Sequence, residues 1–278
     1  MTDLPTLLAT HFIARRDVKA RQLLTGEYNP DKSHWQMANL SDHLAGRATY
    51  GHYLVSQENQ TKLFAFDIDL EVSGSWIQQA DLSQLPEDWH SGPEADHWFA
   101  HNSYVHEFAP REDWKNRAHP GRPWLKQQMR ELVEKFTCAV RDHLGIPTVA
   151  AYSGNKGVHV YGLTGLIPAA EAREAAKLVM ATVGGGRFQI HKGNNFYKDT
   201  SVDWHDSYHN FSIEIFPKQD TVKEGGYGNL MRLPLGVNLK NPSDPTFILD
   251  QSTAHNTITP ASPELAARIL ASGNPWSA

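Results

Sequence analysis

The chain has 278 residues, of which 40% are hydrophobic and 21% are charged, and its net charge is −5 at pH 7. This composition is typical of a soluble globular protein, and the excess of acids argues against bulk non-specific binding to nucleic acid. No apolar run is long enough to span a bilayer, and the N-terminus has no secretory signal pattern. The single cysteine, Cys138, excludes an internal disulfide and a multi-cysteine zinc site, so we expect a reducing, cytoplasmic setting.

Residues 1–45 predict a lead-in of helix and loop. Apolar positions indicate a short helix that includes Phe12, Ala20, Leu23 and Leu24. Gly26–Ser33 predicts a loop with a turn at its Asn-Pro-Asp sequence. Tyr50–Val55 predicts a strand that a short polar turn joins to the next one, so we expect these two strands to form a hairpin-like pair.

The stretch Lys62–Glu71 combines an apolar run with two closely spaced aspartates. The run predicts a buried strand, on which Asp67 and Asp69 point to one face and Ile68 to the other. Two like charges on one face repel each other, and a bound divalent cation would relieve that repulsion. The alternative is that the strand ends here and both acids face water.

Residues 72–122 have no regular period, and we expect a long irregular insertion there. Four histidines fall in it, namely His90, His97, His101 and His106. No carboxylate or cysteine completes a recognisable set of metal ligands around them, so we favour a role without metal.

The second half of the chain predicts an α+β fold with a largely antiparallel or mixed sheet. A helix begins at Pro123 and ends at Gly145, with one apolar face that includes Cys138. The remaining predicted elements are strands at 148–152, 158–163, 211–216, 230–233 and 247–249, and helices at 168–183 and 263–271. We expect residues 250–278 to form a C-terminal tail.

The turn that follows the 148–152 strand is a candidate phosphate cradle. Its glycines allow backbone amides to approach a ligand, Ser153 offers a hydroxyl, and Lys156 offers a positive charge. His159 lies on the returning strand, on the same face as Tyr161. The alternative is a glycine-rich hairpin with a structural histidine.

Glu214 lies inside an apolar strand, where a carboxylate is costly to bury unless it is paired or binds metal. A third carboxylate on a neighbouring strand would complete a two-metal site. Arg232 lies among apolar residues before a proline and is suited to clamp a phosphate, with Lys240 as a weaker candidate. The alternatives are a solvent-facing acid for Glu214 and an ion pair for Arg232.

In order and content, these motifs resemble the archaeo-eukaryotic primase superfamily, the primase-polymerases. That family carries an acid-x-acid pair, a serine and histidine element and a final acid on a strand, which here match Asp67 with Asp69, Ser153 with His159, and Glu214. The sequences Glu-Ile-Phe-Pro-Lys-Gln and Gly-Asn-Leu-Met-Arg-Leu-Pro-Leu-Gly look closest to primase domains of TOTE conflict systems and CRISPR-associated primase-polymerases. The resemblance covers roughly residues 45–240.

The resemblance implies one catalytic domain over residues 1–278, with an RRM-like sheet beside a second small α/β lobe. It implies two Mg²⁺ or Mn²⁺ ions held by the three carboxylates, with a triphosphate held by Ser153, Lys156, His159 and Arg232. It adds Asn229 as a weaker candidate for binding the sugar or phosphates. The implied activity is template-directed transfer of nucleotides from (d)NTPs to a 3′-hydroxyl, with primer synthesis de novo. Alternatives are a primer-dependent repair polymerase, a degenerate nucleotide-binding module and a metal-dependent nuclease.

Two features depart from the family pattern. The spacing from Ser153 to His159 is longer than in the tightest serine-x-histidine form, which weakens the assignment of the serine. The chain also has too few cysteines for the zinc module of many primases. Either it initiates without that module, or it is a domain of a longer protein with helicase, nuclease or CRISPR-type partner domains. We expect the single-stranded or primed DNA template to lie between Arg111 and Arg130.

Overall fold

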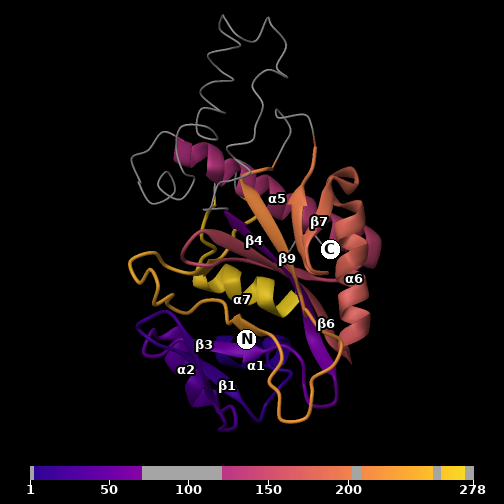
Figure 1. Cartoon of the computed structure of the whole chain (residues 1–278). Coiled ribbons are helices and arrows are strands. Elements are labelled where there is room, and N and C mark those ends of the chain that lie inside the picture. The colour runs from indigo at the N-terminus through magenta and orange to yellow at the C-terminus, as the bar shows by residue number, and fades with distance from the viewer. Residues whose placement is uncertain (1–2, 71–120, 202–207, 253–257, 273–278) are drawn as a thin grey trace, which may run out of the picture.

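The protein is built from two antiparallel sheets with helices packed around them (Figure 1). A computed structural model describes residues 3–70, 121–201, 208–252 and 258–272. The predicted insertion and its four histidines therefore lie outside the described residues, apart from 121–122. The described α-helices are α1 (Leu4–Phe12), α2 (Met37–Leu44), α5 (Gly121–Leu144), α6 (Ala169–Thr182) and α7 (Pro263–Ser272). None of these helices is long and apolar enough to cross a membrane.

The large sheet has the strand order β11-β5-β6-β4-β9-β8-β7. Its strands are β4 (Gln60–Leu70), β5 (Thr148–Tyr152), β6 (Gly157–Pro168), β7 (Phe188–Lys192), β8 (Phe196–Asp199), β9 (Phe211–Phe216) and β11 (Phe247–Ile248). The long strand β4 lies at its centre, between β6 and β9, because its apolar residues on both faces need cover from neighbours.

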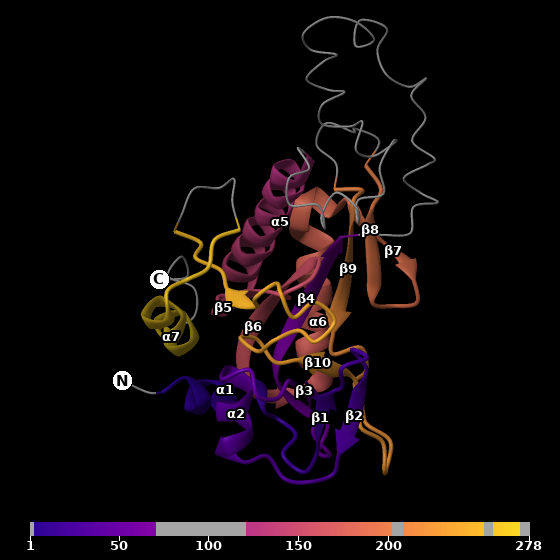
Figure 2. The ribbon, with the colours of Figure 1, turned by 90° about the vertical axis from the view of Figure 1, so that its left-hand side faces the viewer.

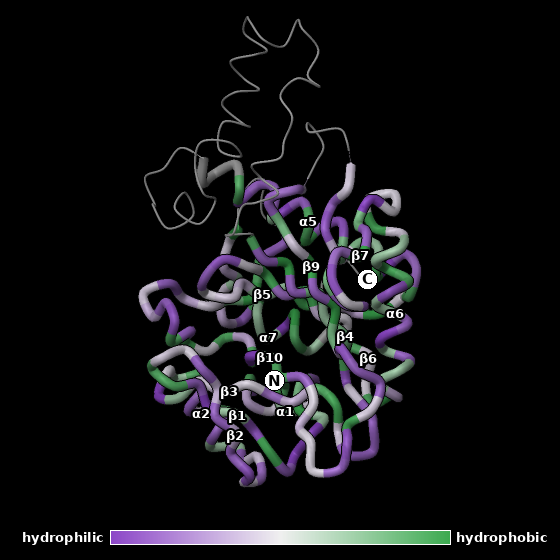
Figure 3. The backbone as a smooth tube through the Cα atoms, in the orientation of Figure 1, coloured by the Kyte–Doolittle hydropathy of each residue, from purple (hydrophilic) through white to green (hydrophobic). Residues whose placement is uncertain are grey.

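Each face of the large sheet buries a separate hydrophobic cluster. On one face, Phe66 and Ile68 of β4 pack with Phe136 of α5 and Val179 of α6. The other face packs against α1 and α7, which meet each other there. Hydrophobic segments consequently lie in the interior of the molecule and hydrophilic ones in its outer loops (Figure 3).

The small sheet has the order β10-β3-β1-β2 and lies at one end of the large sheet (Figure 2). Its strands are β1 (Lys19–Gln22), β2 (Tyr28–Asp31), β3 (Tyr50–Tyr53) and β10 (Leu230–Arg232). With α1 and α2 it forms the small α/β lobe that the resemblance implies. The sheet brings residues near 20, 50 and 230 together, far apart in the sequence.

The prediction for residues 1–45 is wrong in part. The segment expected as a helix to Leu24 contains β1, and the segment expected as a loop contains β2. These strands carry no apolar run. β1 forms by pairing with β3 and β2 by pairing with β1, and Pro30 is tolerated because β2 is an edge strand. The expected pairing of β3 with β4 is also wrong, since Asn59, at a positive φ of 58°, turns the chain from one sheet into the other.

Other predictions are confirmed or adjusted. The apolar face of α5 is buried as expected, although Cys138 itself is only half-buried. The C-terminal segment is anchored rather than loose, because Ala266, Ile269 and Leu270 of α7 are buried in the cluster that contains α1. The hairpin of β7 and β8 was not predicted, because its polar residues give no clear alternation.

Candidate active site

The two aspartates of β4 lie at the centre of a row of polar side chains. Asp67 is directly opposite His159 of β6 on one side and Glu214 of β9 on the other. Directly opposed residues of antiparallel strands share a face, so these three side chains and Asp69 point to the same side of the sheet. This face is the one toward the small lobe. Ala65 and Tyr161 are each two residues from Asp67 and His159 along the same strands, so they share the face, and they pack in the cluster with α1.

Asp67 is held beside a hydrogen-bonded histidine. Its Oδ1 lies 3.3 Å from Nε2 of His159, whose Nδ1 is 2.8 Å from the hydroxyl of Tyr161. Burial by itself raises the pKa of Asp67, but attraction to His159, Lys156 and Arg232 outweighs it, so the pKa lies below its ordinary value. The carboxyl of Asp67 is therefore ionised at neutral pH.

Asp69 is paired with the lysine of the predicted cradle. Nζ of Lys156 lies 3.0 Å from Oδ2 of Asp69 and donates a hydrogen bond of 2.9 Å to the carbonyl of Leu70. Burial and the nearby charge of Asp67 raise the pKa of Asp69 to about 6. The ammonium group of Lys156 thus supplies the positive charge beside the Asp69 carboxylate.

Seven of the nine predicted site residues line one cleft of about 240 Å³ between the two sheets. The seven are Asp67, Asp69, Ser153, Lys156, His159, Arg232 and Lys240. Arg232, from β10 of the small sheet, donates a hydrogen bond to the carbonyl of Ser153, and Asn238 donates another of 3.2 Å. The cleft therefore has the carboxylates of Asp67 and Asp69 on one wall and the positively charged side chains of Arg232 and Lys240 on the other. This arrangement suits a ligand that combines a metal ion with phosphates.

The other two predicted residues, Glu214 and Asn229, do not line this cleft. Glu214 is half-buried and forms an ion pair with Lys218, whose Nζ also lies 4.6 Å from the centre of the Phe216 ring. Asn229 accepts a hydrogen bond of 2.8 Å from the backbone N–H of Lys218. This contact gives Asn229 a structural role in holding the segment that follows β9.

The donor atoms of the cleft fit a divalent cation. Oδ1 of Asp67 is buried and has no hydrogen-bond partner, although it lies close to His159. Such an oxygen is costly unless a cation or a ligand satisfies it, and carboxylate oxygens are the ligands that Mg²⁺ and Mn²⁺ prefer. Within the part of the chain that the structure describes, no three acidic, histidine or cysteine side chains form a ready metal site. A cation held by Asp67 and Asp69 would thus need a further donor, from Glu214 or from a substrate.

Among the cleft residues that sequence reasoning did not assign to the site are Gln22, Tyr28 and Asn238. Gln22 hydrogen-bonds to Asn238 and to the backbone of Leu239, so it fixes the loop that follows β10. Burial raises the pKa of Tyr28 to about 12. No local signal marks Gln22 and Tyr28, because they reach the cleft only through pairing of β1 and β2 in the small sheet, whereas Asn238 reaches it from the loop that follows β10.

The predicted template path is contradicted at its C-terminal end. Arg130 is buried in α5, where it donates a hydrogen bond of 2.7 Å to the carbonyl of Gln251. A buried arginine bonded to the backbone is not available to a DNA strand. Arg111, at the other end of the path, lies outside the described residues.

Comparison with known proteins agrees with this geometry. Curated proteins give no significant match to the chain. The family described as the TOTE conflict system archaeo-eukaryotic primase domain matches residues 8–259, which include both sheets and every residue of the cleft. With its mixed α+β fold, its two antiparallel sheets and this match over most of its length, the chain belongs to the archaeo-eukaryotic primase domain family of TOTE conflict systems.

Proposed function

We propose that the chain is a DNA primase-polymerase, a nucleotidyltransferase that adds nucleotides from (d)NTPs to a 3′-hydroxyl under the direction of a DNA template. The observation that carries this proposal is the cleft in which Asp67 and Asp69 face Arg232 and Lys240. Family membership supports nucleotide and DNA substrates in general. Because both sheets supply walls of the cleft, we also propose that residues 1–278 act as one catalytic domain.

In this proposal the carboxylates of Asp67, Asp69 and Glu214 hold two divalent cations. Bound cations lower the pKa of an attacking hydroxyl and neutralise charge on the phosphates. Glu214 already lies on the correct face, opposite Asp67, and it would join the site by giving up its ion pair with Lys218 in favour of a cation. With a cation at Asp69, Lys156 would be available to contact phosphate oxygens instead of pairing with this carboxylate.

The other cleft residues bind the triphosphate. His159 donates to a phosphate oxygen from the base of the cleft, with Ser153 beside it. Arg232 binds the same group from the small lobe, where its contact with the Ser153 carbonyl already fixes its direction. Lys240 adds a positive charge at the same wall.

Replacement of Asp67 tests the site. We expect Asp67→Ala to reduce primer extension by at least about 10³-fold, as loss of an electrostatic group in the reacting centre does. Circular dichroism and thermal unfolding should match wild type, because Asp67 is a half-buried residue outside both hydrophobic clusters. Asp42→Ala, at a half-buried acid on α2 that pairs with Arg47, is the matched control and should extend primers normally. A folded Asp67→Ala protein with wild-type activity would disprove the assignment.

A second assay separates the proposed activity from its alternatives. Single-stranded template, labelled nucleotides and no primer give product only if the enzyme starts chains de novo. Product that needs a primer identifies a gap-filling or repair polymerase instead. Metal-dependent nucleotide binding without turnover identifies a degenerate binding module, and degradation of the template identifies a nuclease.

A further inference from the structure

The acidic face of the large sheet continues beyond the cleft onto the hairpin of β7 and β8. Glu214 of β9 is directly opposite Phe196 of β8, and Phe196 is directly opposite Lys192 of β7. Lys198, two residues after Phe196, is opposite Ser212, which is itself opposite Asp69. Phe196, Lys192 and Lys198 therefore share the face that carries the carboxylates. We call these three residues the hairpin platform.

The platform combines an aromatic ring with positive charge. Nζ of Lys198 lies 6.0 Å from the centre of the Phe196 ring, and the ring of His191 lies 6.0 Å from the same ring. Lys192 and His191 are exposed, and Phe196 and Lys198 are half-buried. The only acid in Phe188–Asp199 is Asp199, which is buried. The surface of the hairpin is thus cationic, although the whole chain is acidic.

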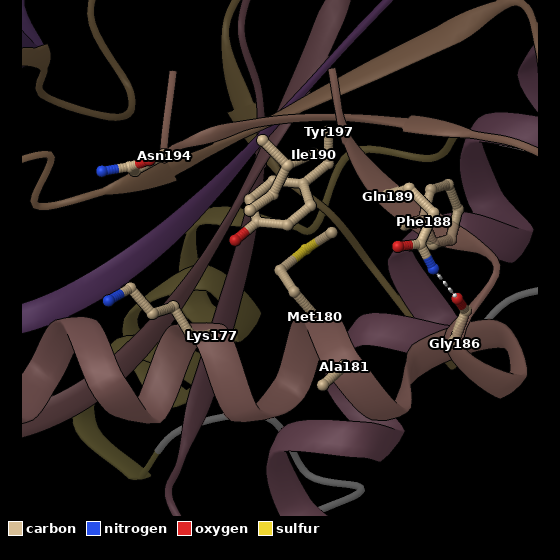
Figure 4. A pocket seen from close by; sticks show the side chains of 9 residues that line it. All are labelled: Lys177, Met180, Ala181, Gly186, Phe188, Gln189, Ile190, Asn194 and Tyr197. Carbon is tan, nitrogen blue, oxygen red and sulfur yellow. Dashed lines mark hydrogen bonds between the residues drawn. The ribbon is translucent and has the colours of Figure 1, made fainter. Parts of the chain in front are cut away.

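The opposite face of the hairpin is fixed against α6. Phe188 and Tyr197 are buried there, in the cluster that packs under α5 and α6. Together with Met180 and Lys177 of α6 they line a pocket of about 520 Å³ (Figure 4). Gln189, which is opposite Lys198 and so lies on the platform face, donates a hydrogen bond of 2.7 Å to the carbonyl of Gly186. One face of the hairpin therefore holds it in place, and the other face presents the platform.

We infer that the hairpin platform binds a single-stranded segment of nucleic acid as it leaves the cleft. Aromatic rings stack on bases without regard to sequence, and flanking lysines attract the phosphate backbone. Strands lie about 4.8 Å apart, so Phe196, two strands from Asp67, lies about 10 Å across the sheet from it. A strand that ends at the reacting carboxylates can reach this ring with a neighbouring nucleotide. Whether the bound strand is the template or the primer rests on the proposed function, whereas binding of a single strand to the platform does not.

The test is binding of a fluorescein-labelled oligothymidylate of about 20 nucleotides to the full chain, followed by fluorescence anisotropy without metal or nucleotide. We expect Phe196→Ala to weaken binding about 5- to 150-fold. Lys192→Ala and Lys198→Ala should each weaken binding and lower the slope of log K against log salt by about 0.7. Lys177→Ala, which removes the same charge on the α6 side, should leave binding unchanged.

Phe196→Leu is the control for misfolding, because it keeps an apolar side chain and removes only the aromatic ring. It should bind nearly as weakly as Phe196→Ala with an unfolding temperature close to wild type. Wild-type affinity in Phe196→Leu, or equal losses in Lys177→Ala and Lys192→Ala, would overturn the platform. The same binding measurements on Asp67→Ala protein separate the two proposals. If this protein cannot extend primers but still loses oligothymidylate binding when Phe196 is replaced, the platform is supported independently of the catalytic proposal.

Discussion

At the scale of single residues, the buried side chain of His43 links two segments of the small lobe. Nε2 of His43 lies 3.0 Å from the carbonyl of Pro234, and its Nδ1 accepts a 3.1 Å hydrogen bond from the backbone N–H of Tyr50. Both bonds are satisfied by the neutral ring with its proton on Nε2. Burial lowers the pKa of His43 to about 4, and burial lowers the pKa of His52 to about 3.

These histidines predict acid sensitivity of folding. The unfolded histidine titrates near 6.5 and the folded one near 4, so the unfolded chain binds more protons between these values. The contribution of His43 to stability is complete above pH 6.5 and falls as the pH drops toward 4, by roughly 3 kcal/mol. Urea unfolding at pH 7, 5.5 and 4 measures it.

The control is His43→Gln, which removes the titrating group. This variant should be less stable at pH 7 but lose less stability on acidification than wild type, with His52 supplying part of what remains. An unchanged pH slope would show that His43 is not the titrating group.

At the scale of elements, the first residue of β6 shapes the acidic site. A Cβ added at Gly157 would lie 2.1 Å from Oδ1 of Asp69 and 2.7 Å from the carbonyl oxygen of Ile68. Glycine at this position lets Asp69 lie against the neighbouring strand and reach Lys156. The position of the Asp69 carboxylate therefore depends on the absence of a side chain at Gly157 as well as on the contact with Lys156.

Gly157→Ala should displace the Asp69 carboxylate. We expect at least a tenfold weaker affinity for Mn²⁺, measured by electron paramagnetic resonance, with a parallel loss of extension activity. Gly162→Ala on the same strand is the matched control, because its Cβ would meet the ring of Phe64 instead. It should lower stability by about 1–3 kcal/mol while Mn²⁺ affinity in the folded protein stays unchanged. Equal Mn²⁺ affinities of the two variants would contradict this account.

At the scale of the whole molecule, the site exists only because two sheets meet. The large sheet supplies Asp67, Asp69 and His159, and the small sheet supplies Tyr28 and Arg232. The carbonyl of Ser153, in the turn before β6, accepts the Arg232 hydrogen bond and so links the two sheets. The relative position of the lobes thus sets the distance between the carboxylates and the phosphate-binding groups.

Arg232→Gln should weaken nucleotide binding across this junction. Loss of a charged hydrogen bond corresponds to roughly 1.5–3 kcal/mol, or about a 10- to 150-fold rise in KM for dNTP. Steady-state extension kinetics measure the change. Arg47→Gln is the control, because Arg47 is an exposed arginine of the small lobe that pairs with Asp42. A rise in KM of the same size in both variants would remove Arg232 from the phosphate site.

The sequence by itself determined the elements whose patterns are local. The apolar period of α5, the apolar run of β4 and the alternation at Asp67 and Asp69 each reflect burial of one face, so they appear directly in the residue order. The family motifs then pointed to most of the cleft. The acids are adjacent on one strand, and their shared face follows from the geometry of the strand alone.

Only the tertiary structure decided which segments meet. β1 and β2 have no apolar period; β1 becomes a strand by pairing with β3 and β2 by pairing with β1, which is how Tyr28 reaches the cleft. Pairing likewise puts Phe196 opposite Glu214, and packing buries Arg130, which the sequence suggested as a DNA contact. The physical reason is that strand pairing and register depend on contacts between residues far apart in the chain, which no local pattern encodes.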